Sequence, residues 1–243
     1  MTPFELTYLG LEPLMSPLYH LVRGRLRNLI GGRRIGLLDV GGRRSHYTTG
    51  LSADVILTDL PRRSAMHRAL NLGMTDAMVK ETIGRRSNLR AVIYDDMTRS
   101  SLRGSSFEGA VAIEVLEHVD CDEQFVREVA RVLRPGGFFL MTTPNGDSVP
   151  NHNPDHRRHY TRTQLETLLL TTFSEVRVEY AIYGGRFHNW SLPSWSARRP
   201  LRTGRAMVGG ALTTLRSAGS AMAGRAGGTQ HLLAVARVAG GER

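Results

Sequence analysis

Seven short apolar segments recur along the chain and alternate with stretches of helical periodicity, and this alternation narrows the possible folds more than any other feature. The predicted strands lie at 35–40, 53–60, 89–96, 109–116, 138–143, 176–182 and 231–238. Strands that alternate with helices form a mostly parallel sheet, because each right-handed crossover places its helix against a face of the sheet. The sequence therefore predicts an α/β fold, a Rossmann-like, doubly wound, mostly parallel seven-stranded sheet with helices on both faces.

The helical patterns divide the chain into a core and two additions. Apolar residues at helical spacing run from Leu14 to Ile30 and end at Gly31-Gly32, which predicts an amphipathic helix within an N-terminal helical cap, residues 1–34. Further helices are predicted between 71 and 87, over 121–133 with Asp120 and Glu123 as a capping box, and after Thr161. We expect the core to comprise 35–190 and 229–240, with a basic helical insert at 191–228 between the last two strands.

Composition and charge exclude several classes of protein. The 243 residues contain one cysteine, Cys121, so no internal disulfide and no cysteine-built zinc site is expected. No run of about 18 apolar residues or signal-peptide pattern occurs, so a cytoplasmic location is the expectation. The net charge is +10, but from residue 191 onward eight arginines face a single acid, Glu242. Because the excess is concentrated there, nucleic acid is not an expected partner.

Acidic residues stand at the carboxyl ends of successive predicted strands. They are Asp39, Asp59, the pair Asp95 and Asp96, and Glu114. In a doubly wound sheet, ligands bind beyond these strand ends, and a carboxylate after the second strand accepts hydrogen bonds from ribose hydroxyls. The G-x-G-x-x-G loop that holds a pyrophosphate is absent. The pattern favours a nucleoside without phosphates, of which S-adenosylmethionine is the common one.

Several motifs in a fixed order resemble the class I S-adenosylmethionine-dependent methyltransferases, in the style of the small-molecule O-methyltransferases. They are LLDVGG at 37–42, VILTDL at 55–60, DDMTRSSLRGSSFEGAVAIEVLEHV at 95–119, FVREVARVLRPGGFFLMTTPNG at 125–146 and HRRHYTRTQLETLL at 156–169. The resemblance covers about residues 35 to 183 and the closing strand. It implies S-adenosyl-L-methionine as the cofactor and methyl transfer as the activity.

The resemblance also implies roles for individual residues. Asp39 would hold the methionine end of the cofactor, Gly41 and Gly42 would let the loop approach it, and Asp59 would hold the ribose. The adenine amino group would face Asp96, with Asp95 as the alternative. Glu114 and Leu116 would line the cofactor near its sulfonium.

The first loop departs from the family pattern. It reads D-V-G-G-R-R-S, with Arg43 and Ser45 at later glycine positions. One interpretation is a re-routed loop in which Arg43 or Arg44 pairs with the cofactor carboxylate. The other is that both arginines point into solvent.

Histidines supply the candidates for a general base, which a hydroxyl acceptor requires near neutral pH. We favour His156 as the catalytic base, followed by His159 and His118, with a structural contact as the alternative for the last two. The spacing of His152, Asp155, His156 and His159 also resembles a divalent-metal cluster, but the Pro/Asn-rich context favours no metal.

The expected function is that of an S-adenosylmethionine-dependent methyltransferase (EC 2.1.1.-) acting on a hydroxyl of a small molecule, sugar or lipid-linked glycan. An RNA methyltransferase and a non-catalytic methyltransferase-fold binding module are the alternatives. The basic insert provides a further expectation. Its apolar helical face, arginines and two tryptophans suit peripheral contact of residues 196–226 with the anionic inner face of a membrane. A helical hairpin packed on the sheet, or on a second subunit in a homodimer, is the other interpretation.

Overall fold

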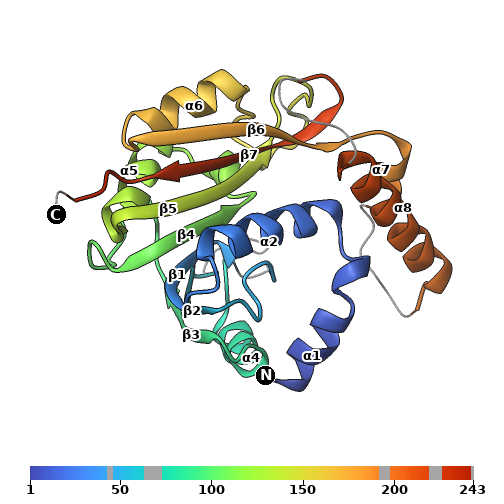
Figure 1. Cartoon of the computed structure of the whole chain (residues 1–243), viewed down its shortest axis with the longest axis horizontal. Coiled ribbons are helices and arrows are strands. Elements are labelled where there is room, and N and C mark those ends of the chain that lie inside the picture. The colour runs from blue at the N-terminus through green and yellow to red at the C-terminus, as the bar shows by residue number, and fades with distance from the viewer. Residues whose placement is uncertain (43–45, 63–72, 192–197, 219–225, 242–243) are drawn as a thin grey trace.

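The computed structural model describes residues 1–42, 46–62, 73–191, 198–218 and 226–241. One seven-stranded sheet forms the centre of the molecule (Figure 1). Its strands are β1 (Ile35–Val40), β2 (Ala53–Asp59), β3 (Leu89–Tyr94), β4 (Phe107–Ile113), β5 (Leu133–Pro144), β6 (Glu175–Tyr183) and β7 (Thr229–Arg237). All seven overlap the predicted strands, so the predicted sheet is confirmed.

The strand order is β3-β2-β1-β4-β5-β7-β6. Strands β1 to β5 pair in parallel, whereas β7 runs antiparallel to both β5 and β6. The order reverses beside β1, whose neighbours β2 and β4 lead in opposite directions across the sheet. A crevice forms at such a point, beyond the carboxyl ends of the strands.

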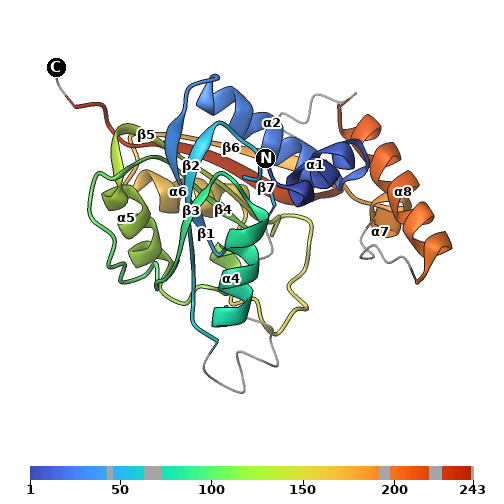
Figure 2. The same cartoon turned by 90° about the horizontal axis from the view of Figure 1, so that it is seen from below.

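Helices cover both faces of the sheet (Figures 1 and 2). The helical elements are α1 (Pro3–Gly10), η1 (Glu12–Leu14), α2 (Pro17–Ile30), α4 (Asp76–Arg85), η3 (Leu116–His118), α5 (Asp122–Val132), α6 (Arg162–Leu170), α7 (Arg186–Ser191) and α8 (Pro200–Ala218). Val22 and Leu26 of α2 join the core on one face, while Phe125 of α5 and Leu165 of α6 join the core on the other. None of these helices is long and apolar enough to cross a membrane.

The ends of one helix and one strand differ from those predicted from the sequence. The first long helix begins at Pro17 instead of Leu14, because Ser16 caps it, and α1 was not predicted. The fourth strand ends at Ile113, since Glu114 has a φ of 55° and leaves the extended conformation.

Helix α5 also differs at its start. The predicted capping box is absent: Cys121 is the N-cap and no side chain caps the helix. Asp120 instead forms an ion pair with Arg157 at 2.9 Å. Helix α6 begins after Thr161, as predicted, and Thr161 forms a capping box with Gln164.

Candidate active site

A cavity of about 540 Å³ lies at the carboxyl ends of β1 to β4, where the strand order reverses. This volume is in the range of small-molecule and cofactor sites. Its walls come from the segments that follow these four strands and from the loop after β5, which contributes Asn153, Asp155 and His156. Segments distant in sequence therefore meet around one site.

Four of the predicted carboxylates line this cavity: Asp59, Asp95, Asp96 and Glu114. Asp59 ends β2, and its Oδ1 accepts the backbone N–H of Leu60 at 2.8 Å. Residues that follow two neighbouring parallel strands thus place several carboxylate oxygens on one wall.

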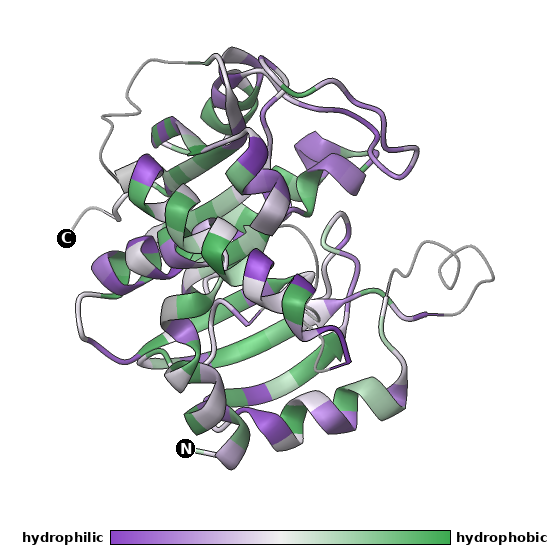
Figure 3. Ribbon diagram, turned by 90° about the vertical axis from the view of Figure 1, so that its right-hand side faces the viewer, coloured by the Kyte–Doolittle hydropathy of each residue, from purple (hydrophilic) through white to green (hydrophobic). Residues whose placement is uncertain are grey.

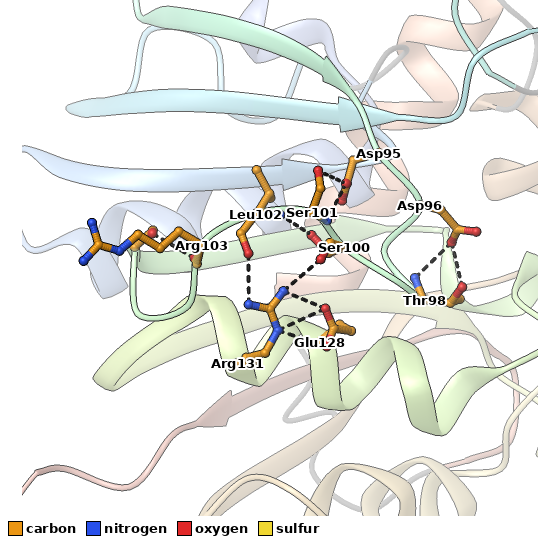
Figure 4. A network of polar contacts seen from close by, with 10 residues as sticks. Asp95, Asp96, Thr98, Ser100, Ser101, Leu102, Arg103, Glu128 and Arg131 are labelled. Atoms are coloured by element: carbon orange, nitrogen blue, oxygen red, sulfur yellow. Dashed lines mark hydrogen bonds and ion pairs between the residues drawn. The ribbon is translucent and has the colours of Figure 1, made fainter.

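Asp95 and Asp96 each accept hydrogen bonds from a residue close in sequence, and Figure 4 shows these bonds. Asp95 Oδ1 accepts the backbone N–H and the hydroxyl of Ser101, both at 2.9 Å. Asp96 Oδ1 accepts the backbone N–H of Thr98 at 3.0 Å and its hydroxyl at 2.8 Å. Asp95 Oδ2 is buried and has no hydrogen-bond partner in the described part of the chain, so one carboxylate oxygen remains to receive a ligand donor.

Arg131 fastens this loop to α5. Its guanidinium donates to the carbonyl oxygens of Ser100 at 3.0 Å and Leu102 at 2.9 Å, and it pairs with Glu128 at 2.7 Å (Figure 4). Guanidinium bonds to the carbonyl groups of Ser100 and Leu102 restrict the backbone between these two residues. The loop that carries Asp95 and Asp96 is thereby held against the helix.

Asp39 is not among the residues that line the cavity, contrary to the direct cofactor contact that we expected. Its side chain is 1% exposed and accepts a hydrogen bond from Thr48 Oγ1 at 2.6 Å, while Thr48 Oγ1 accepts one from Arg86. The Arg86 guanidinium lies 3.9 Å from Asp39. Burial raises the pKa of Asp39 to about 6, against the lowering effect of Arg86 and Thr48. In this arrangement Asp39 secures the segment that carries Tyr47 at the cavity wall.

Gly41 and Gly42 are required by the turn after β1. Gly41 has a φ of 66°, which disfavours other residues, and it lines the cavity. A Cβ atom at Gly42 would lie 2.3 Å from Asp39 Oδ1. The two glycines therefore fit the predicted close loop, while Arg43, with Arg44 and Ser45, lies outside the described residues.

Glu114 follows β4 and lines the cavity with an uncommon backbone conformation, a φ of 55° for a non-glycine residue. Its Oε1 accepts a hydrogen bond from Thr142 Oγ1 at 2.8 Å and lies 3.2 Å from His231 Nδ1. Burial alone would raise the pKa of Glu114, but His231 and Thr142 outweigh it, so the pKa is lowered. Glu114 is thus held as a carboxylate.

Leu116 is not placed as expected. Its side chain is fully buried in the core shared with α5 and α6, whereas the adjacent Val115 lines the cavity. The reason is the backbone turn at Glu114, which shifts the outward position by one residue.

The three predicted histidines lie together beside the cavity. His159 Nδ1 lies 2.8 Å from the carbonyl oxygen of Val149, and a carbonyl only accepts, so Nδ1 donates. In the neutral ring, Nε2 of His159 is then an acceptor, and it receives the Nδ1–H of His156 at 2.8 Å. These two hydrogen bonds leave the lone pair of His156 on Nε2. His156 lines the cavity, whereas His159 does not.

The electrostatic setting keeps His156 neutral. Burial lowers the pKa of His156 below 6.5, and the neighbouring His118 and His159 lower it further. The His118 ring lies edge-on to that of His156, with ring centroids 4.8 Å apart. His118 Nδ1 donates to the carbonyl oxygen of Asp155 at 2.9 Å, which leaves its Nε2 with a lone pair too.

The cluster His152, Asp155, His156 and His159 is not assembled as a metal site within the described part of the chain. Glu117, His118 and His156 instead bring one ligand atom each within 4.8 Å of one another. Ligand atoms that bind an ion tetrahedrally at about 2.1 Å lie roughly 3.4 Å from one another. The 4.8 Å limit between the ligand atoms of these three residues is wider than that separation. Burial and the nearby charge of Glu114 raise the pKa of Glu117 well above its usual range, which favours a neutral carboxyl group.

Sequence reasoning missed Tyr47, Val115 and His231. Tyr47 and Val115 line the cavity, and His231 comes from β7, far along the chain, to pair with Glu114. The position of Val115 next to Glu114 was a usable signal. The contribution of His231 depends on the antiparallel insertion of β7 between β5 and β6, which no local pattern reveals.

Residues 38–141 match the sequence profile of a family described as "Methyltransferase domain". Over these residues the chain is similar to methyltransferase domains. A probable S-adenosylmethionine-dependent methyltransferase of Mycolicibacterium smegmatis is 33% identical over 144 residues, which cover 56% of this chain and 52% of that protein. The chain thus spans about half the length of this curated relative.

Solved structures of methyltransferases share the fold of this chain over nearly its whole length. An S-adenosylmethionine-dependent methyltransferase of Archaeoglobus fulgidus is 17% identical with a TM-score of 0.55, and the match covers 90% of this chain and 94% of that one. A Burkholderia thailandensis 1,6-didemethyltoxoflavin-N1-methyltransferase, solved with S-adenosylhomocysteine, is 16% identical with a TM-score of 0.52, covering 91% and 78%.

Two of these relatives are named as S-adenosylmethionine-dependent methyltransferases, and the third was solved with S-adenosylhomocysteine. The cofactor of such proteins is S-adenosylmethionine. The cavity fits it: the acids Asp59, Asp95 and Asp96 suit hydroxyl and amino donors, and the positive-φ turn at Gly41 brings the backbone close to a ligand. Asp95 Oδ2 is the buried oxygen whose missing partner such a donor would supply.

Proposed function

We propose that the protein transfers the methyl group of S-adenosylmethionine to a hydroxyl group of a small molecule, a sugar or a lipid-linked glycan. The observation that carries the choice of a hydroxyl acceptor is the histidine relay, in which the Val149 carbonyl and His159 leave His156 Nε2 unprotonated. An alcohol needs a base in order to become a competent nucleophile, and a neutral imidazole is suited to that task at neutral pH.

The cofactor-binding half of the proposed site is the wall that carries the acids. Asp59 would hold the ribose hydroxyls, and Asp95 or Asp96 would accept from the adenine amino group. Asp39 would act from beneath the loop, through Thr48 and the turn at Gly41 and Gly42. Glu114, kept ionised by His231 and Thr142, would place a negative charge beside the positive end of the cofactor.

In the proposed reaction the cofactor supplies the methyl group and the protein accepts the proton of the acceptor. When bound, S-adenosylmethionine supplies an electrophilic methyl group on a sulfonium. His156 Nε2 would take the proton of the acceptor hydroxyl, whose oxygen would receive the methyl group, with S-adenosylhomocysteine as the other product. His156 is therefore the proposed catalytic residue and His159 a positioning residue. His118, whose Nε2 also keeps a lone pair, orients the acceptor or receives the proton from His156.

A labelled methyl group tests the proposal. The protein is incubated with S-adenosylmethionine carrying a labelled methyl group and with separate polar and lipid extracts as acceptors. A methyl ether product survives mild alkali, whereas a methyl ester releases methanol, and a methylated amine binds a cation exchanger. Label in an alkali-stable, uncharged product supports hydroxyl transfer, and label in amines would refute it. Cofactor binding without any transfer would instead favour a non-catalytic binding module.

A further inference from the structure

Helix α8 exposes an apolar stripe on its outer side. Leu201 is 90% exposed, Leu215 is 71% exposed and Val208 is 54% exposed, and Leu212 lies on the same side. Steps of seven, four and three residues place these positions on one face of a helix. Four exposed aliphatic side chains in a single row are uncommon on a surface that meets only water.

The opposite face of α8 attaches the helix to the rest of the molecule. Ala206 and Thr213 are buried there, and a Cβ atom at Gly209 would lie 2.7 Å from the carbonyl oxygen of Phe187 in α7. Small residues therefore allow close packing of α8 on α7. Among the described residues, the side chains of the stripe stay exposed, whereas other positions of α8 contact α7, α2 and β6, which is compatible with a helical hairpin packed on the sheet.

Exposed arginines lie near the stripe, in a segment of the sequence that has no acidic residue. Residues 180–241 contain eight arginines and neither aspartate nor glutamate. Arg198, Arg199, Arg202 and Arg205 are exposed at and near the start of α8. Arg205 also stacks on the ring of Trp190, 4.8 Å from its centroid. Figure 3 views the molecule from this side, where apolar and polar segments alternate along the helices.

We infer that α8 lies in the plane of an anionic lipid bilayer, with the apolar stripe inserted among the acyl chains and the arginines at the headgroups. An amphipathic helix with a basic polar side binds membranes in this way. A second copy of the chain fits less well, because a two-fold contact between α8 helices would bring arginines together without an acid. A polyanion such as RNA would use the arginines but not the stripe.

Co-sedimentation with vesicles tests this inference independently of methyl transfer. The full chain is mixed with vesicles of phosphatidylcholine plus phosphatidylglycerol, and with vesicles of phosphatidylcholine alone. We expect binding to the anionic vesicles that weakens as salt is added. Absence of binding to the anionic vesicles would overturn the inference.

Two variants separate the apolar and the electrostatic contributions. Leu201→Ser with Leu215→Ser should weaken binding about tenfold or more, since it removes two inserted side chains. Arg199→Gln with Arg202→Gln should weaken it about 25-fold, at roughly fivefold for each arginine. The matched controls are Leu170→Ser on α6, and Arg103→Gln with Arg127→Gln near and on α5, all of them exposed.

Both controls should bind like the unchanged protein. An unchanged melting temperature and unchanged S-adenosylmethionine affinity in every variant exclude unfolding as the cause of a loss. Equal binding by the α8 variants and the controls would refute the role of α8. Light scattering that shows a dimer dissociated by the leucine changes, without vesicle binding, would assign the stripe to a second copy of the chain.

Discussion

His156 donates its Nδ1–H to Nε2 of His159 at 2.8 Å, and His159 in turn donates to the carbonyl oxygen of Val149. Because the Val149 carbonyl can only accept, it determines which nitrogen donates in each of the two hydrogen bonds. The lone pair of His156 is thereby assigned to the nitrogen that is not engaged in the relay. The base strength and the ring orientation of His156 at the cavity thus depend on His159, which does not line the cavity.

Substitution of the two histidines should separate catalysis from positioning. His156→Ala should lower turnover by about 10²–10⁴ and leave S-adenosylmethionine affinity unchanged, because it removes the base alone. His159→Ala should lower kcat by roughly tenfold or more without raising KM, since the His156 ring loses its orientation. His159→Gln should recover part of that loss, because its amide oxygen can accept the Nδ1–H. Equal loss of cofactor affinity in both alanine variants would contradict these roles.

The pH dependence of kcat should show a single acid limb. Burial, followed by the nearby His118 and His159, lowers the pKa of His156 below 6.5, so the base is unprotonated across neutrality. Activity should therefore rise with pH, reach half of its maximum below pH 6.5 and stay level above it. Initial rates at saturating cofactor measure the profile. A midpoint above pH 7 would contradict the assignment of His156 as the base.

Chelation should leave activity unchanged. Direct deprotonation by His156 requires no ion, and the neutral state favoured for Glu117 makes this carboxyl group a poor ligand. Rates are compared before and after treatment with EDTA, with the apo-protein's melting temperature as a control for structural effects. Loss of activity that magnesium or manganese restores would instead assign Glu117, His118 and His156 as metal ligands.

Asp59 should contribute to cofactor affinity and not to the fold. Asp59→Ala should weaken S-adenosylmethionine binding by about 1 to 3 kcal/mol, the range for hydrogen bonds to a charged group. Asp54→Ala is the matched control, because Asp54 lies near the other end of the same strand and pairs with Arg34 and Arg90 on the surface. Calorimetry should find binding unchanged in the control. Equal weakening in both variants would argue for a general effect on β2.

Features of the fold and the site could be predicted where they depend on the order of residues within one short segment of the sequence. Strand-end acids such as Asp59 and Asp96 were found at the cavity because parallel strands bring their carboxyl ends to one edge. Leu116 was misplaced because the positive φ of Glu114 is a tertiary effect that the run of apolar residues does not show. Asp39 was expected at the cofactor, and its burial depends on Thr48 and on Arg86, which approaches from the segment after α4. Contacts of this kind form only when the whole sheet is assembled.

Asp39 provides a prediction about stability. Burial raises its folded-state pKa to about 6 from 3.8, so the folded protein holds this proton more tightly than the unfolded chain. Stability from this group is therefore present at low pH and is lost as pH rises from about 4 to about 6, by about 3 kcal/mol in total. Asp39→Asn, which mimics the protonated form, should remove this loss. Urea titrations at pH 4 and pH 7 measure the difference in unfolding free energy between the variant and the unchanged protein. Between these two pH values the difference should shift in favour of the variant by most of that amount. A shift in the opposite direction would show that Arg86 holds Asp39 ionised in the folded state.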